Sequence, residues 1–133
     1  MSSIAGLGID LEDVARIEEM LARWGRAFAT KIFSDSEILY CESKFHPAQH
    51  YAARFAAKEA FAKSLGTGWR GQFRWKDVEV RNDESGKPSI HVHGTLAAEV
   101  RQYQIHLSLS HTRAQVVAVV VLERARDNYL ENQ

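Results

Sequence analysis

The feature that most constrains this chain is one long helical pattern over residues 47–65. Pro47 is suited to the first turn of a helix, and Gly66 is suited to the position just beyond the end of one. Large apolar side chains recur between these two residues, and six alanines lie between Tyr51 and Leu65. We therefore predict a long helix that begins at Pro47 and stops at Gly66.

Segments on both sides of this helix alternate between apolar and polar residues, as half-buried strands do. Strand patterns cover residues 4–10, 75–81, 89–93, 105–110 and 114–123, and shorter helical patterns cover 13–24, 27–33, 34–43 and 96–103. Asp10 or Glu12 is suited to the start of the helix after the first strand, and Ser34 with Glu37 has the form of a capping box. Helices mixed with antiparallel hairpins in this order indicate an α+β fold.

No linker, repeat or shift in composition divides the chain. Its 133 residues, 45% apolar and 26% charged, are sufficient for a hydrophobic core without disulfides or structural metals. We expect a single domain over residues 1–133, with a core at about 4–123 and a C-terminal tail at 124–133.

Cysteine content and apolar runs bear on location. Cys41 is the single cysteine, so neither an intrachain disulfide nor a cysteine-rich zinc site can form. The N-terminus lacks the pattern of a secretory signal, and the longest apolar run, residues 116–122, is far too short to cross a bilayer. We expect a cytoplasmic protein.

Charge is balanced overall but unevenly placed. The chain has 17 basic and 17 acidic residues, yet the first 20 residues contain five acids and one base. Residues 43–76 contain seven bases and only one acid, Glu59. A phosphate-rich ligand would suit this second segment.

Glu59 and Lys63 are one helical turn apart on the face of the predicted long helix that also carries Ala52, Phe55 and Ala56. A surface ion pair at this spacing contributes only a few tenths of a kcal/mol and is sufficient to explain the two residues. The alternative is a metal-ligating glutamate beside a phosphate-binding lysine.

Two glycines precede a carboxylate in Gly6-Leu7-Gly8-Ile9-Asp10. One interpretation is a strand followed by an N-capping aspartate. The other is that Asp10 is a ligand of Mg²⁺, which commonly takes one or two protein carboxylates together with substrate phosphates. A dinucleotide-binding fold is excluded, because the full glycine spacing and a βαβ unit are absent.

The turn between the last two predicted strands contains Ser110-His111-Thr112. A histidine in a turn is usually a solvated surface residue, and its functional alternative is a contact with phosphate or ribose. A serine–histidine nucleophilic pair is disfavoured, because adjacent strand residues point to opposite faces.

Together these segments strongly resemble holo-acyl-carrier-protein synthase, over residues 4–123. The motifs that carry the resemblance are Gly6-Leu7-Gly8-Ile9-Asp10 with Ala15-Arg16-Ile17 downstream, residues 54–68, the turn at 82–88, and Leu109-Ser110-His111-Thr112. Residues after 123 and the tryptophan-rich segment 69–75 depart from the pattern.

The resemblance implies a 4′-phosphopantetheinyl transferase fold and transfer of 4′-phosphopantetheine from coenzyme A to a serine of apo acyl carrier protein, in support of fatty acid biosynthesis. Adenosine 3′,5′-bisphosphate is the other product. It implies Asp10 and Glu59 as ligands of Mg²⁺ and Lys63 beside the phosphates. Glu59 or a metal-bound water is the general base, and the residues do not decide between them.

Coenzyme A contacts are implied at further positions of the matched motifs. These positions are Arg54, Lys58, Lys63, Gly66, Gly68, His111 and Thr112, with the turn at 82–88 beside the adenine. The family also implies a homotrimer with active sites between subunits, and the apolar strand at 114–122, which needs cover on both faces, is consistent with that.

Acyl carrier proteins are acidic, and residues 20–33 contain three bases and no acid. We predict a docking strip of Arg16, Met20, Arg23, Arg26 and Phe28, in which charge speeds encounter and an apolar residue anchors the carrier. Two rival functions remain. One is a nucleic-acid-binding module built on the bases and aromatics of residues 43–76, and the other is a different Mg²⁺-dependent nucleotide enzyme.

Overall fold

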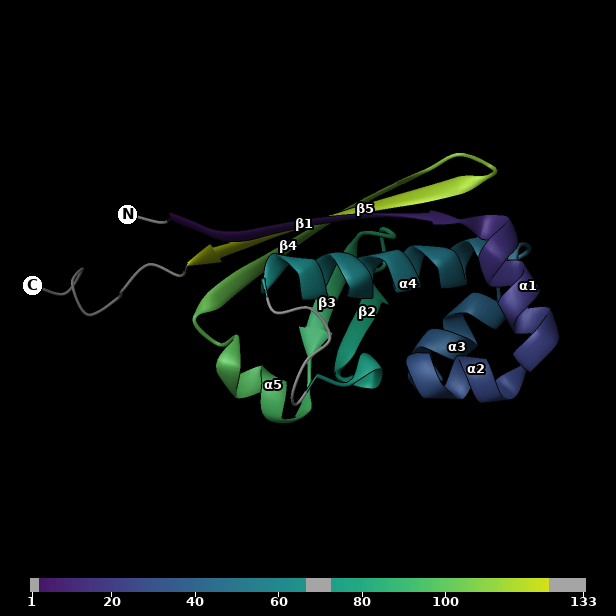
Figure 1. Ribbon diagram of the computed structural model, residues 1–133, viewed down its shortest axis with the longest axis horizontal. Coiled ribbons are helices and arrows are strands. Elements are labelled where there is room, and N and C mark those ends of the chain that lie inside the picture. The colour runs from purple at the N-terminus through teal and green to yellow at the C-terminus, as the bar shows by residue number, and fades with distance from the viewer. Residues whose placement is uncertain (1–2, 67–72, 125–133) are drawn as a thin grey trace, which may run out of the picture.

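The computed structural model describes residues 3–66 and 73–124. Its elements, in chain order, are β1 (Ser3–Asp13), α1 (Val14–Trp24), α2 (Arg26–Ile32), α3 (Asp35–Glu42), α4 (Pro47–Ser64), the 3-10 helix η1 (Trp75–Asp77), β2 (Val78–Asn82), β3 (Pro88–Val92), α5 (Gly94–Glu99), β4 (Tyr103–His111) and β5 (Gln115–Arg124). Figure 1 shows α4 at the centre, with long strands on one side of it and the β2–β3 hairpin on the other. The α+β prediction is confirmed.

The larger sheet is antiparallel, with strand order β1-β5-β4. Its register pairs Gly8 with Val120 and Val120 with Leu107, so these three residues lie across one face of the sheet. The face toward α4 buries Val116, Ala118, Val120 and Leu122 of β5. Residues alternate between the two faces of a strand, and the intervening residues therefore point to the outer face.

Gly6 and Gly8 allow α4 to lie directly on β1. A Cβ atom on Gly8 would lie 1.9 Å from the carbonyl oxygen of Ala60, and one on Gly6 would lie 2.1 Å from that of Ser64. Any side chain at either position would force the strand and the helix apart, so the two glycines have a packing role that neither a cap nor a turn would explain.

Two hydrophobic clusters hold the elements together. One joins the C-terminal half of α4 to the inner face of β5, the β2–β3 hairpin and α5. The other joins α1, α2 and α3 to the N-terminal half of α4, around Phe33 and Tyr51, whose rings are 5.0 Å apart. The long helix therefore contributes to both clusters, and its alanines fit where backbones approach closely.

The structure corrects three boundaries. β1 runs to Asp13, so Asp10 and Glu12 are strand residues and do not cap α1. Residues 75–77, predicted as strand, form η1, and α5 ends at Glu99, so it is shorter than predicted. The capping box of Ser34 and Glu37 is confirmed by both reciprocal hydrogen bonds.

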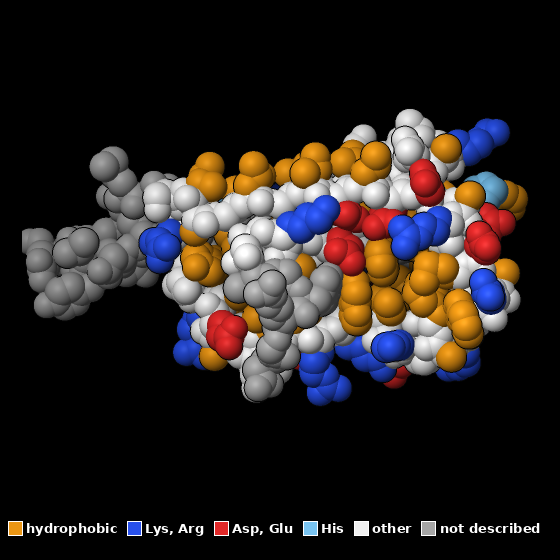
Figure 2. All heavy atoms as spheres, in the orientation of Figure 1, with side chains coloured by type: hydrophobic (Ala, Val, Ile, Leu, Met, Phe, Trp, Pro, Cys, Tyr) orange, Lys and Arg blue, Asp and Glu red, His pale blue; other side chains and the backbone are white. Residues whose placement is uncertain are grey.

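The outer face of the β1-β5-β4 sheet carries exposed apolar side chains. Leu7, Ile9 and Leu11 of β1 are each more than half exposed. The register places them beside Val121, Val119 and Val117 of β5. Figure 2 shows hydrophobic side chains along this edge of the molecule, over the strand labelled β1 in Figure 1.

Within residues 3–66 and 73–124, no helix combines the length and apolar composition needed to cross a bilayer. The single-domain assignment to residues 1–133 stays a prediction. Of the predicted tail, only Arg124 is described, at the end of β5.

Candidate active site

An acidic group lies where β1 crosses α4. Asp10 and Glu12 follow Gly6 and Gly8 on the face of β1 that packs on the helix, because strand residues alternate. Lys63 Nζ of α4 donates to Asp10 Oδ1 at 3.1 Å and to the carbonyl oxygen of Ile9 at 3.0 Å. Asp10 and Lys63, far apart in sequence, are thus brought together by the fold.

Glu12 is a member of this group that the sequence analysis did not assign. Its side chain is only 8% exposed and lies 4.0 Å from Arg16. The pKa of Glu12 is raised to about 8, chiefly by burial and then by a hydrogen bond with Asp10 and the charge of Asp10, while the charge of Arg16 lowers it. The charge of Glu59, on α4, makes the smallest contribution and also raises it. Gly8, Asp10 and Glu12 are spaced two residues apart. A first strand predicted to extend to Asp13 would therefore have placed all three on the same face.

The acidic group has an unsatisfied position. With the carboxyls ionised, Asp10 Oδ2 is buried and has no hydrogen-bond partner. Either the proton held by Glu12 or a cation can satisfy this oxygen. Figure 2 shows acidic side chains gathered between basic ones near β1 and α4.

Asp10 and Glu59 are suited to Mg²⁺, which commonly binds through one or two protein carboxylates. No group of three or more His, Cys, Asp or Glu side chains in the described segments is arranged as a metal-binding cluster. Mg²⁺ commonly binds through one or two carboxylates and completes its shell with water and substrate phosphates, so it does not need such a cluster. Asp10, with its unpartnered oxygen, and Glu59, partly buried on α4, supply that number.

Arg54 lies on a different side of α4. Five residues separate it from Glu59, which rotates the two side chains by about 140° around the helix axis. Arg54 Nη2 donates to Asn82 Oδ1 at 2.6 Å, and its guanidinium lies 4.1 Å from the centroid of the Tyr40 ring. Lys44 Nζ is 4.5 Å from the same centroid. Arg54 is buried, and its Nε has no partner.

Lys58 is fully buried inside the protein. Its Nζ donates to Glu37 Oε1 at 2.9 Å, to the carbonyl oxygen of Trp75 at 2.9 Å and to that of Val78. Burial lowers the pKa of Lys58, and Glu37 partly offsets this. An ammonium group has three N–H donors, and all three have acceptors here, so we leave Lys58 out of the proposed coenzyme A contacts.

His111 and Thr112 lie at the other end of α4 from Lys63. Gln49 Nε2 is 2.8 Å from His111 Nδ1 and donates to the carbonyl oxygen of Thr112 at 3.3 Å. Gln49 precedes Glu59 by ten residues, about 15 Å along a helix axis. The described chain therefore does not bring His111 to the acidic group, although His111 and Thr112 line a groove of about 980 Å³ with residues of α1 and of the start of α4.

The glycines after α4 are described only in part. Gly66 has φ +77 and open space around the position of a Cβ atom, as expected for the residue that ends the helix. Gly68 and the tryptophan-rich departure up to residue 72 lie outside the described residues.

The predicted carrier-docking strip is divided by the structure. Arg16, Arg23 and Arg26 are exposed, and Met20 is half-buried against the cluster around Tyr51. Phe28 is buried in that cluster, with its ring 6.2 Å from that of Phe33. Phe28 therefore serves the core and is not free to anchor a partner in this conformation.

Comparison with known proteins shows the family to which this chain belongs. The model of the 4′-phosphopantetheinyl transferase superfamily matches residues 6–120. The chain belongs to this superfamily. Among its relatives, the holo-[acyl-carrier-protein] synthase of Syntrophus aciditrophicus is 48% identical over 128 residues, which are 93% of this chain and 99% of that protein. The enzyme of the same name from Geobacter sp. strain M21 is 49% identical over 91% of this chain and 99% of its own.

Solved structures of the superfamily have the same fold. The holo-[acyl-carrier-protein] synthase of Neisseria meningitidis has a TM-score of 0.83 at 35% identity, and the match covers 90% of this chain and 98% of that one. The enzyme of Bacillus anthracis, solved in complex with CoA (3′,5′-ADP), has a TM-score of 0.77 at 35% identity over 92% of this chain and 98% of its own. The resemblance to holo-acyl-carrier-protein synthases is confirmed.

Proposed function

We propose that this protein transfers 4′-phosphopantetheine from coenzyme A to a serine of an apo acyl carrier protein in a Mg²⁺-dependent reaction. The observation that carries the proposal is the acidic group at the crossing of β1 and α4, in which Asp10 lies beside Lys63 and has a buried oxygen that lacks a partner when the carboxyls are ionised. Phosphoryl transfer needs alignment of the reactants and compensation of phosphate charge, and a carboxylate pair with an adjacent lysine serves both needs.

Asp10 and Glu59 would hold the metal. When bound, Mg²⁺ would offset the negative charge of the pyrophosphate as the bond to the leaving group breaks. Lys63, whose side chain is half exposed, can contact the phosphates directly. Glu59 is partly exposed as well, and its carboxylate can accept the proton of the attacking serine hydroxyl.

The second half of the proposed site is the cationic region around Arg54. Arg54 contacts Asn82 at the start of the 82–88 turn, and Lys44 lies on the same Tyr40 ring. A guanidinium with an unpartnered Nε, next to an ammonium, suits the phosphate groups of coenzyme A, and the turn would lie beside the adenine.

The separation between the acidic group and the cationic region around Arg54 favours a homotrimer with shared active sites. Arg54 and Glu59 point away from each other on α4, and His111 lies at the far end of that helix, so the site of one copy would be completed by residues of the next. The apolar outer face of the β1-β5-β4 sheet is the surface we propose for contact between copies.

The remaining parts of the proposal concern partner and location. The carrier would dock through the exposed Arg16, Arg23 and Arg26, with half-buried Met20 beside them. We propose a role in fatty acid biosynthesis in the cytoplasm. A nucleic-acid-binding function is less well supported, because Lys58, one of the seven bases of residues 43–76, is fully buried and uses its three N–H donors within the protein.

Intact-mass spectrometry of an apo acyl carrier protein tests the reaction. The carrier is incubated with this protein, coenzyme A and Mg²⁺, beside matched samples with EDTA and with Asp10→Asn or Glu59→Gln. We expect a gain of one phosphopantetheine in the Mg²⁺ sample, no gain with EDTA, and a loss of at least about a hundredfold in rate for each variant. No gain with several carriers, from folded protein, would reject the function. Near-normal rates in one variant would remove that residue from the site.

A further inference from the structure

Within the part of the chain that the structure describes, the small β2–β3 sheet has two strands, and side chains complete the free edge of β2. Isolated two-stranded hairpins are only marginally stable in water. Along β2, the carbonyl oxygen of Val78 accepts from Lys58 Nζ, and the N–H of Val80 donates to Glu37 Oε2 at 3.0 Å. A neighbouring strand would supply a donor and an acceptor at alternate residues in the same way.

Lys58 and Glu37 also bond to each other, at 2.9 Å, and both side chains are 0% exposed. Glu37 accepts from the N–H of Ser34 at 3.0 Å as part of the capping box of α3. One buried ion pair therefore joins α3 and α4 to the edge of β2. Breaking such a pair on one side alone leaves an uncompensated buried charge.

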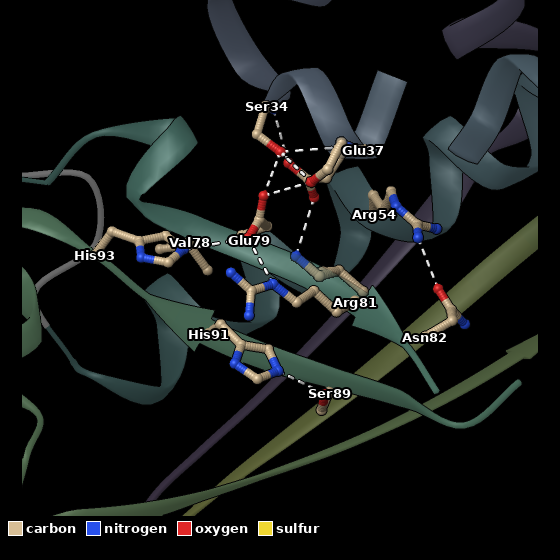
Figure 3. A network of polar contacts seen from close by, with 12 residues as sticks. Ser34, Glu37, Arg54, Val78, Glu79, Arg81, Asn82, Ser89, His91 and His93 are labelled. Carbon is tan, nitrogen blue, oxygen red and sulfur yellow. Dashed lines mark hydrogen bonds and ion pairs between the residues drawn. The ribbon is translucent and has the colours of Figure 1, made fainter. Parts of the chain in front are cut away.

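The residue between these two contacts is tied to α3 as well. Glu79 accepts from Ser34 Oγ and Ser36 Oγ, both at 2.6 Å, and from Arg81 Nε at 2.8 Å. These hydrogen bonds lower the pKa of Glu79 to about 2, although burial alone would raise it. Figure 3 shows Glu79 between Ser34 on one side and Arg81 on the other.

The far end of β2 reaches the cationic half of the proposed site. Asn82 accepts from Arg54 at 2.6 Å, and its own Nδ2 donates to the carbonyl oxygen of Gly86 at 3.0 Å, which holds the turn closed. Arg54 and Lys58 are one turn apart on α4. α4 therefore donates hydrogen bonds to both ends of β2, from Lys58 to the start of the strand and from Arg54 to its end.

We propose that Lys58 and Glu37 are positioning residues for coenzyme A: they set the β2–β3 hairpin on α4 so that Asn82, Arg54 and the 82–88 turn are held in place for the nucleotide. This inference rests on the proposed function. Lys58 acts through β2 and does not touch the substrate, since its three donors are used within the protein. The pair thus has a task besides stability.

The test compares two variants of the full-length protein. Lys58→Met alone leaves Glu37 buried without its partner and is expected to be strongly destabilised. Lys58→Met/Glu37→Leu removes both charges and recovers stability, but it leaves the edge of β2 without its donor and acceptor. We expect the double variant to fold and to bind adenosine 3′,5′-bisphosphate about tenfold more weakly by calorimetry, because small misplacements in a site are costly.

Kinetics and hydrogen exchange separate positioning from general destabilisation. In the double variant the KM for coenzyme A should rise about tenfold, while kcat and the KM for the carrier stay within about twofold. The amide of Val80, which bonds to Glu37 in the wild type, should exchange faster. Tyr51→Phe is the matched control, since it removes another side-chain hydrogen bond of α4, the part-buried one to Glu42 at 2.8 Å, which does not involve the hairpin.

The outcomes are distinct. If the wild type binds neither coenzyme A nor adenosine 3′,5′-bisphosphate, the proposed function fails. If the wild type binds them and the folded double variant binds them equally well, the function stands and the positioning role is wrong. An equal loss of affinity in Tyr51→Phe would show that the effect follows stability alone, which also overturns the inference.

Discussion

At the scale of single residues, the raised pKa of the Glu12 carboxyl makes the stability of the fold depend on pH. Its pKa is raised to about 8 from an ordinary value of 4.5, first by burial and then by Asp10. The folded protein binds the Glu12 proton more tightly than the unfolded chain does. The stability that this group contributes is therefore fully present below pH 4.5 and is lost as the pH rises through 8. Glu12 therefore makes the fold less stable at alkaline pH.

We predict that Glu12→Gln removes this pH dependence. Between pH 4.5 and 8, the free energy of unfolding of the wild type in EDTA should fall by several kcal/mol relative to that of the variant, at about 1.4 kcal/mol for each pKa unit, because His50 and His91 titrate in both proteins and cancel in the difference. Denaturant titrations across this range measure the difference. Glu19→Gln, on the exposed part of α1, is the control, and identical slopes in wild type and Glu12→Gln would contradict the prediction.

At the scale of elements, the contact between β1 and α4 depends on a missing side chain. Gly8→Ala would place a methyl group 1.9 Å from the carbonyl oxygen of Ala60, so the strand must move. We predict a loss of at least about 1–3 kcal/mol in stability, the usual cost of overpacking, together with weaker Mg²⁺ binding because Asp10 moves with the strand.

Thermal unfolding and calorimetric titration with Mg²⁺ check this expectation. Gly66→Ala is a useful comparison, since it has open space but a φ of +77, and should cost about 1 kcal/mol through backbone strain alone. A Gly8→Ala protein as stable as the wild type would mean that the close contact is not required.

The exposed bases of α1 and α2 carry a second prediction at this scale. Arg23→Glu/Arg26→Glu should raise the KM for the carrier about tenfold and make it less sensitive to salt, with the KM for coenzyme A unchanged, because charge reversal repels an acidic partner. Arg16 is left out of this pair, since it lies 4.0 Å from Glu12 and its reversal would also alter the acidic group. Carrier kinetics equal to wild type at low salt would remove the docking role.

At the scale of the whole molecule, the proposed trimer depends on the outer face of the β1-β5-β4 sheet. Leu7 and Ile9 are 65% and 58% exposed on the face of β1 that points away from α4. We predict a trimer for the wild type in sedimentation experiments, and dissociation at concentrations at least about a hundredfold higher for Leu7→Glu/Ile9→Glu, because each copy would bury charges in its interface.

Activity should fall together with the trimer if the sites are shared between copies. Leu39→Glu, at a residue of α3 that is 75% exposed, is the control and should leave assembly and activity unchanged. A wild-type monomer with full activity would reject both the trimer and the shared site.

Much of this protein is determined locally along the chain. The long helix, the capping box at Ser34 and the alternation of the strands depend on near neighbours, so the sequence alone predicted them. The family followed from motifs, and the expectation that Asp10, Glu59 and Lys63 form the site rests on the same motifs and stays a prediction.

Other features of this protein depend on burial and on contacts between distant segments, and only the tertiary structure determined them. Lys58 and Arg54 have similar charges and lie one turn apart, yet Lys58 is saturated by Glu37 and two carbonyl oxygens, whereas Arg54 keeps an unpartnered Nε. Glu12 joins the acidic group because β1 continues past Asp10, a boundary that local propensity does not determine. A lysine or a glutamate has the same letter in the sequence whether it faces water or a carbonyl group, and only the packed chain supplies that environment.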